Sequence, residues 1–246
     1  MSKLAIQFKD VSKDFYLQED KTFKEVLTSF ARRKGWAKRK EVLKQLSFLI
    51  NQGETVGIVG KNGAGKSTIM KLIAGVTSPS QGSVTVEGRV APLIELGAGF
   101  HHELSGYENI FLDAAILGMH KTEVEQQLQN IIEFSGLKAD IREPLKRYST
   151  GMQMRLAFSV AVHTNAPILL IDEVLAVGDV EFQHKCLQRL EEIKARTNTT
   201  IVFVSHDQKS VEKFCDRALL LESGNIVMDG EPKDIFIKYN KLANVS

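Results

Sequence analysis

An eight-residue segment, Gly60 to Ser67, has the residue types and spacing of a phosphate-binding loop. It matches the pattern G-x-x-x-x-G-K-[ST] and stands between a short apolar run at 55–59 and a helical pattern. Its three glycines let the backbone curl so that several N–H groups face one anion, and the N-terminus of the following helix adds partial positive charge. The segment therefore predicts a nucleoside triphosphate site.

The side chains of this loop predict individual roles. Lys66 is expected to reach the β- and γ-phosphates, the Ser67 hydroxyl to ligate Mg²⁺, and Thr68 to donate toward the α-phosphate. The backbone contacts are predicted at Gly60, Asn62, Gly63, Ala64 and Gly65. The alternative, a chance glycine turn, is disfavoured because a strand, a loop and a helix follow one another in the required order.

A second acidic element fits the same site. The apolar run Pro167-Ile-Leu-Leu-Ile is followed directly by Asp172 and Glu173. A continuous apolar run is typical of a buried parallel strand, and carboxylates after it lie at the edge where α/β sheets bind ligands. Asp172 is expected to hold Mg²⁺ through water, and Glu173 to polarise the water that attacks the γ-phosphate.

The elements that must position these residues alternate between strands and helices. Strands are predicted at 4–11, 42–50, 55–59, 83–87, 90–94, 168–171 and 201–204, and helices at 181–196 and 208–214. A hairpin over 218–228 turns at Gly224-Asn225, and a last helix opens near Pro232. The middle of the chain, about 97–163, is helical. We expect an α/β fold with a largely parallel sheet and an inserted helical subdomain.

A third motif identifies a family. Tyr148-Ser-Thr-Gly-Met-Gln-Met-Arg155 resembles LSGGQ, the signature sequence of ABC-transporter ATPases, with Ser149 as a helix cap and Gly151 as a bare backbone donor. Ala176 to Asp179 resembles the D-loop of that family, and His206 its switch histidine. Phe15 stands where the family stacks an aromatic ring on adenine, and Tyr16 is an adjacent alternative.

The resemblance covers residues 4–240 and includes departures from the family pattern. Thr150 replaces the first signature glycine, Met152 replaces the signature glutamine, and Glu95 is the nearest counterpart of the Q-loop glutamine. The segments LIELGAGFHHELSGYENI, YSTGMQMRLAFSVAV and IDEVLAVGD are similar to ATP-binding subunits that export O-antigen, capsular polysaccharide or teichoic acid. O-antigen exporters of the short form, without a carbohydrate-binding C-terminal domain, are the first choice among them.

The resemblance implies the fold, the ligands and the partners. The fold is a single ABC ATPase domain over 1–246: a P-loop NTPase (RecA-like) core, an antiparallel β subdomain, the helical subdomain and a C-terminal hairpin and helix at about 217–246. Two copies would form a head-to-tail homodimer around two Mg²⁺·ATP. The signature turn of one copy (149–152) and Asp179 would complete the nucleotide site of the other, with Lys66, Glu173 and His206 catalytic. The partners implied are two copies of a membrane channel subunit and a lipid-linked polysaccharide, at the cytoplasmic face of the bacterial inner membrane.

Composition and charge agree with this class of protein. The 246 residues include 32 Lys and Arg against 30 Asp and Glu, so the net charge is +2. Nine basic and four acidic residues fall within 19–44, which leaves the rest of the chain slightly acidic, unlike a general nucleic-acid binder. No apolar run is long enough to span a membrane and the N-terminus lacks a secretion signal, so neither a membrane span nor export is expected. Cys186 and Cys215 predict no disulfide framework.

The basic stretch at about 19–41 admits two interpretations. Phe23, Val26, Leu27 and Phe30 share one helical face, and basic residues flank Trp36. Such a segment would suit anionic headgroups at a membrane surface or a glycolipid diphosphate. It would equally suit an amphipathic helix docked on its own core, with a solvated charged loop. Separately, residues 107–117 would receive a coupling helix of the channel subunit, by analogy with the family.

Rival classes lack parts that they would need. A soluble ABC protein of DNA repair or translation would need a long coiled coil or a second ATPase cassette, and this sequence shows neither. A P-loop kinase or GTPase would lack the signature turn and the AVGD and SHD motifs, which this sequence has. An ABC ATPase for another exported substrate, such as a drug or a lipid, stays open.

Overall fold

The computed structural model describes residues 3–17, 38–94, 96–172 and 179–243. Three predictions therefore lie outside the described residues: the Q-loop position Glu95, the general base Glu173, and most of the amphipathic insertion. The same holds for the first three residues of the D-loop, 176–178.

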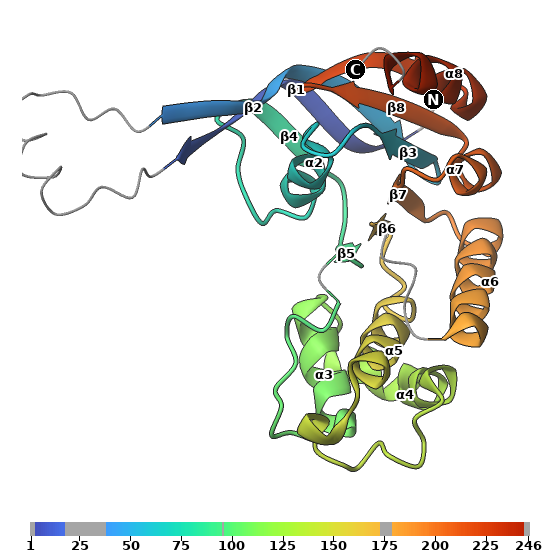
Figure 1. The fold of residues 1–246 in the computed structure, drawn as a ribbon. Coiled ribbons are helices and arrows are strands. Elements are labelled where there is room, and N and C mark those ends of the chain that lie inside the picture. Colours follow the sequence, from blue (N-terminus) through green and yellow to red (C-terminus); the bar gives the residue numbers. More distant parts are fainter. Residues whose placement is uncertain (1–2, 18–37, 95, 173–178, 244–246) are drawn as a thin grey trace, which may run out of the picture.

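Two sheets form the larger lobe of the molecule (Figure 1). The first is antiparallel, in the order β2 (Lys38–Asn51), β1 (Leu4–Leu17) and β4 (Gln81–Val86). The second has the order β5 (Val90–Pro92), β6 (Ile168–Ile171), β7 (Thr200–Val204), β3 (Thr55–Val59), β8 (Arg217–Glu222) and β9 (Asn225–Gly230). Its first five strands are parallel and β9 is antiparallel to β8.

The helices divide between this lobe and a smaller one. α2 (Lys66–Ile73), α7 (Gln208–Phe214) and α8 (Pro232–Ala243) accompany the sheets, and α6 (Val180–Arg196) begins beside the second lobe and runs toward the sheets (Figure 1). The second lobe contains α3 (Gly106–Ile116), α4 (Lys121–Ser135), the short 3₁₀ helix Leu145–Arg147 and α5 (Thr150–Ala161). The predicted α/β fold with an antiparallel sheet and a helical insertion is confirmed.

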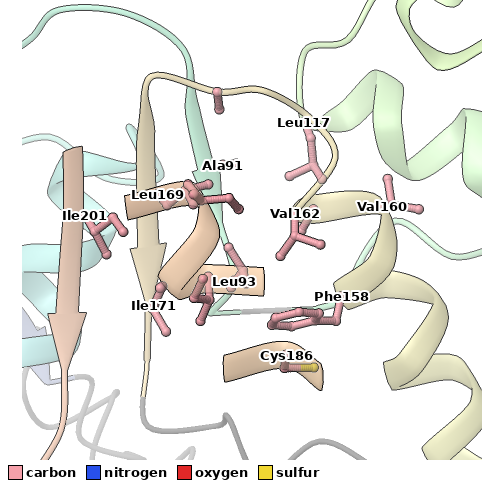
Figure 2. Packing of buried hydrophobic residues seen from close by; sticks show 14 of the residues in the cluster. Ala91, Leu93, Leu117, Phe158, Val160, Val162, Leu169, Ile171, Cys186 and Ile201 are labelled. Carbon is pink, nitrogen blue, oxygen red and sulfur yellow. The ribbon is translucent and has the colours of Figure 1, made fainter. Parts of the chain in front are cut away.

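Strand β6 is apolar throughout because both of its faces are covered. Ile168 and Leu170 belong to the core between the sheets and α2, whereas Leu169 and Ile171 belong to the core shared with the helical lobe. Figure 2 shows the second core, in which Phe158 of α5 lies close to Cys186 of α6. Fully burying each such side chain contributes about 1.5–3 kcal/mol, so the end of β6, where Asp172 follows, is held firmly.

Arg89, just before β5, ties the helical lobe to the sheet. Its guanidinium donates to the carbonyl of Gly118 at 2.7 Å and to that of Thr164 at 2.6 Å, and it pairs with Glu123 at 3.2 Å. Gly118 follows α3, Thr164 follows α5, and Glu123 lies in the first turn of α4. One half-buried side chain therefore joins the ends of three helices.

Replacement of Arg89 by Ala is expected to destabilise the protein. Two carbonyl groups lose a charged donor, which costs about 2–3 kcal/mol of unfolding free energy. Arg147→Ala is the control, because the pair of Arg147 with Glu143 is exposed and such pairs contribute little. Denaturant unfolding monitored by circular dichroism measures both. Equal effects of the two substitutions would contradict the role of Arg89.

Asp113 is an acidic side chain buried within α3. It is 6% exposed, and burial raises its pKa from 3.8 to about 7. Because the folded pKa lies above the unfolded value, this carboxyl contributes stability that is present below about pH 4 and lost as the pH rises through 7.

Asp113→Asn is therefore expected to remove a pH dependence. Relative to the wild type, the variant should gain unfolding free energy steadily between pH 4 and 7 and keep the gain at higher pH, by a few kcal/mol in all. Unfolding curves of both proteins at pH 5, 6, 7 and 8 measure the difference. A difference that does not change with pH would show that Asp113 ionises normally.

No helix in the described ranges has both the length and the apolar character needed to cross a bilayer.

Candidate nucleotide site

Three neighbouring strands place the predicted catalytic groups at one edge of the parallel sheet. β3 pairs with β7, and β7 with β6, all in parallel. The loop that begins at Gly60 follows β3, His206 lies two residues beyond β7, and Asp172 follows β6. Ligands bind at the carboxyl edge of such sheets, so the topology gathers these residues where the sequence predicts them.

Close packing explains one glycine of the phosphate-binding loop, and backbone conformation explains another. A Cβ atom on Gly60 would lie 2.4 Å from the carbonyl oxygen of Leu221, which no side chain can tolerate. Gly65 precedes α2 with a φ of 112°, a left-handed conformation that favours glycine. The loop is further fixed by a hydrogen bond from the N–H of Gly224 to the carbonyl of Ala64 at 3.2 Å.

The Lys66 ammonium group lies over its own loop. It donates to the carbonyl of Gly60 at 2.7 Å and to that of Lys61 at 3.1 Å. Burial lowers the pKa of Lys66, and the Asp172 carboxylate opposes this shift; burial likewise raises the pKa of Asp172, opposed by Lys66. The two groups therefore act on each other electrostatically across the site.

An open cleft of about 630 Å³ lies in front of the loop. The predicted residues that line it are Asn62, Gly63, Gly65, Lys66, Ser67, Thr68 and Asp172. The lining also includes Lys40, Glu41, Val42, Lys44, Val204 and Ser223, which were not predicted to bind the nucleotide. Three lysines face two carboxylates there, a balance that suits an anionic ligand.

The additional lysines come from β2. Lys40, Val42 and Lys44 all line the cleft, although the pairing of β2 with β1 shifts register between Glu41 and Leu43. Lys44 stands near the start of the predicted strand 42–50, but Lys40 falls within the predicted basic insertion at about 19–41, whose described end, from Lys38, belongs to β2 instead. Which face turns toward the phosphate loop depends on pairing with β1, and this pairing contains register shifts near Gln45, whose φ is 48°.

The pairing of β1 with β2 also separates the two aromatic candidates. Phe15 is opposite Lys40 and Tyr16 is opposite Arg39. Residues directly opposite in an antiparallel pair share a face, so Phe15 is on the face of the cleft-lining Lys40. The Phe15 ring is 43% exposed, with the Lys13 ammonium 5.2 Å from its centre. Neither aromatic residue lines the cleft itself among the described residues.

The signature turn opens α5, in the helical lobe. The Ser149 hydroxyl accepts a hydrogen bond from the Met152 N–H at 3.2 Å, so the predicted helix cap is present. Ser149 and Thr150 are exposed, and a Cβ on Gly151 would meet only the Ser149 hydroxyl, at 3.9 Å. The Met152 side chain packs against the core. Among the described residues that line the phosphate cleft, none belongs to this turn.

Asp179 and His206 occupy ordered turns beside the sheet. Asp179 caps α6 by accepting from the Phe182 N–H at 2.8 Å, and its other oxygen lies 3.7 Å from Arg155 of α5. Asp179, the described residue of the predicted D-loop, thus contacts the helix that follows the signature turn. His206 is exposed, and the Ser205 hydroxyl before it accepts from the Asp207 N–H at 3.0 Å.

The donors expected to hold Mg²⁺ fit that ion. The Ser67 hydroxyl, in the first turn of α2, and the Asp172 carboxylate, after β6, both line the cleft. Mg²⁺ favours oxygen ligands and takes only one or two from protein when phosphates supply others. Clusters of three or more metal-ligating side chains do not occur in the part of the chain that the structure describes.

Comparison with solved structures supports the fold. The structure of the ATP-binding subunit of an ABC transporter matches 96% of this chain and 93% of its own, with a TM-score of 0.75 and 24% identity. A dimeric ATP-binding cassette in a post-hydrolysis state with ADP and phosphate matches with a TM-score of 0.73, over 92% of this chain and 98% of that chain, at 21% identity.

Comparison of sequences is more specific. RfbB of Klebsiella pneumoniae, an O-antigen export system ATP-binding protein, is 48% identical over 81% of this chain and 80% of its own length. ABC transporter protein AbcA of Aeromonas salmonicida is 47% identical over 83% of this chain, and the alignment spans 66% of AbcA. TagH of Listeria innocua, a teichoic acids export ATP-binding protein, is 41% identical over 97% of this chain and 70% of its own.

The family model described as "ABC transporter" matches residues 43–176, which include the phosphate loop, the signature turn and the β6 carboxylates. Family, fold and motifs agree, and the predicted enzyme class, an ABC ATPase, is confirmed: the chain belongs to the ABC transporter family.

Proposed function

We propose that this chain is the ATP-hydrolysing subunit of an ABC exporter for a lipid-linked polysaccharide, with O-antigen as the first choice. The observation that carries the proposal is the 48% identity to an O-antigen export ATP-binding protein over about four fifths of both chains. The phosphate loop, the carboxylate after β6 and the basic cleft supply the site that such a subunit needs.

Each group in the site has a proposed task. The loop N–H groups and Lys66 bind the β- and γ-phosphates, and Phe15 stacks on adenine. Ser67 and Asp172 hold Mg²⁺, which would neutralise phosphate charge. Glu173 accepts a proton from the attacking water, and His206, at the same sheet edge, contacts the γ-phosphate. Glu95, which lies outside the described residues, is the nearest counterpart of the Q-loop glutamine, and its role stays a prediction.

The separation of the signature turn from the phosphate cleft supports a dimer. Ser149 to Met152 lie in the helical lobe and are not part of the cleft that Lys66 lines. An exposed, capped helix N-terminus is suited to bind an anion presented by another molecule. In the proposed head-to-tail homodimer, each ATP lies between the phosphate loop of one copy and the signature turn and Asp179 of the other.

Partners and location follow from this role. ATP-driven closure of the dimer would move two copies of a membrane channel subunit, with residues 107–117 receiving a coupling helix. The chain would then be peripheral at the cytoplasmic face of the bacterial inner membrane. For the basic insertion, both interpretations remain open: contact with anionic headgroups, or docking on the core of the protein.

Teichoic acid export is the second candidate, because TagH of Listeria innocua aligns with 97% of this chain. Stimulation of ATP hydrolysis distinguishes the two. The chain and its channel subunit would be reconstituted in vesicles, and lipid-linked O-antigen, lipid-linked teichoic acid or neither would be added. Stimulation by O-antigen alone is expected; stimulation by teichoic acid alone selects the second candidate, and stimulation by neither contradicts both candidates.

A further inference from the structure

Lys61, the second residue of the phosphate loop, reaches away from the loop to the C-terminal helix. Its side-chain ammonium donates to the carbonyl of Leu242 at 3.1 Å, although 181 positions separate the two residues. Leu242 is the second-last residue of α8. Carbonyl groups in the last turn of a helix take partners from outside the helix, and a cation is favoured at that end of the helix dipole.

The backbone of the same residue takes part in the phosphate site. Its carbonyl accepts from the Lys66 ammonium at 3.1 Å, beside the bond from Lys66 to Gly60 at 2.7 Å. In the proposed function Lys66 binds the β- and γ-phosphates. To do so, the ammonium must turn from these two carbonyls, and the loop segment 60–62 then loses two of its internal hydrogen bonds.

Helix α8 is a firm support for this segment. Ile235 and Phe236 are fully buried, and the Tyr239 ring packs edge-on against Phe236 with ring centres 5.9 Å apart. The helix lies in the same lobe as β3 and β8 (Figure 1). A fixed helix can therefore restrain a loop that is bonded to its end.

A cavity of about 270 Å³ separates the loop from α8, so the loop is not packed tightly against the helix. Asn62, Gly63, Tyr239 and Leu242 line this cavity together with Lys61. The loop has space to shift in this direction, and the Lys61 ammonium bonds to the helix across it.

We propose that Lys61 is a positioning residue for nucleotide binding. Its bond to the end of α8 holds residues 60–62 in place when Lys66 leaves their carbonyls for the phosphates, so that the loop N–H groups stay directed at the ligand. The inference rests on the proposed ATP site. The proposal requires that loss of the Lys61 donor weaken the binding of ATP and of ADP alike, since both nucleotides place a β-phosphate in the loop.

Equilibrium titration of the full chain with fluorescent ATP and ADP analogues, in EDTA to prevent hydrolysis, tests the proposal. Lys61→Met keeps the apolar stem and removes the donor, and is expected to raise both dissociation constants about fivefold or more. Lys61→Arg, which can still donate, should stay within about twofold of wild type. Lys241→Met is the matched control, because it removes an exposed lysine from the last turn of the same helix.

Steady-state kinetics add a second readout. The KM for ATP should rise with Lys61→Met while kcat at saturating ATP stays within about twofold, because the chemical groups are intact. Three results would each overturn the proposal: dissociation constants within twofold of wild type for Lys61→Met, no recovery with Lys61→Arg, or weakened ATP binding with unchanged ADP binding. Lys66→Ala in the same titration isolates the proposed site: if that variant binds normally, the ATP site itself is wrong.

Discussion

Replacing Glu173 by Gln is expected to lower ATP hydrolysis about 100-fold or more and to accumulate an ATP-bound dimer. The amide cannot accept a proton from the attacking water, and a positioned general base contributes about 10²–10⁴ in rate. Binding should survive, because the phosphate loop and Asp172 are unchanged. With hydrolysis blocked, the γ-phosphate stays in place and continues to contact both copies.

Phosphate release and size-exclusion chromatography with light scattering measure the two effects. Glu125→Gln is the control, since Glu125 is an exposed residue of α4 paired only loosely with Lys121 at 3.8 Å. In the presence of ATP, the wild type should form a dimer only transiently. The Glu173→Gln variant should elute as a persistent dimer. Wild-type turnover in Glu173→Gln would show that another group activates the water.

The sequence predicted well the elements that depend on complete burial or on residues within one turn. The run Ile168 to Ile171 is apolar at every position because cores cover both faces of β6, and its limits match the structure. Ser149 caps α5 as predicted, because a cap depends on residues within one turn. The last helix begins at Pro232, as its fixed φ predicts.

The β1–β2 hairpin was underestimated for a physical reason. Strands were predicted at 4–11 and 42–50, whereas they extend over Leu4–Leu17 and Lys38–Asn51. Their outer parts are charged and lack alternation, and they are held by backbone pairing between distant segments and by the Arg39–Asp14 ion pair. Lys40 enters the cleft through this pairing. A pattern read along one strand does not contain the register with its partner.

Replacing Lys66 by Ala is expected to abolish nucleotide-dependent activity, with a loss of about 100-fold or more in kcat/KM. The ammonium is the one loop cation that would lie against the β- and γ-phosphates, where a charged contact in a partly dehydrated site is worth several kcal/mol. Gly151→Asp should be equally inactive, because its carboxylate would repel the γ-phosphate presented to the signature turn.

A mixed dimer of these two inactive variants tests whether each site is shared. In a head-to-tail dimer, the Lys66→Ala and Gly151→Asp defects meet at one site and leave the other intact. Dimers that carry one tag on each variant, purified through both tags, should regain up to about half of the wild-type phosphate release. If loop and signature turn instead served the same nucleotide within one copy, each half of the mixed dimer would stay inactive. Activity no higher than that of either parent would therefore contradict the shared site.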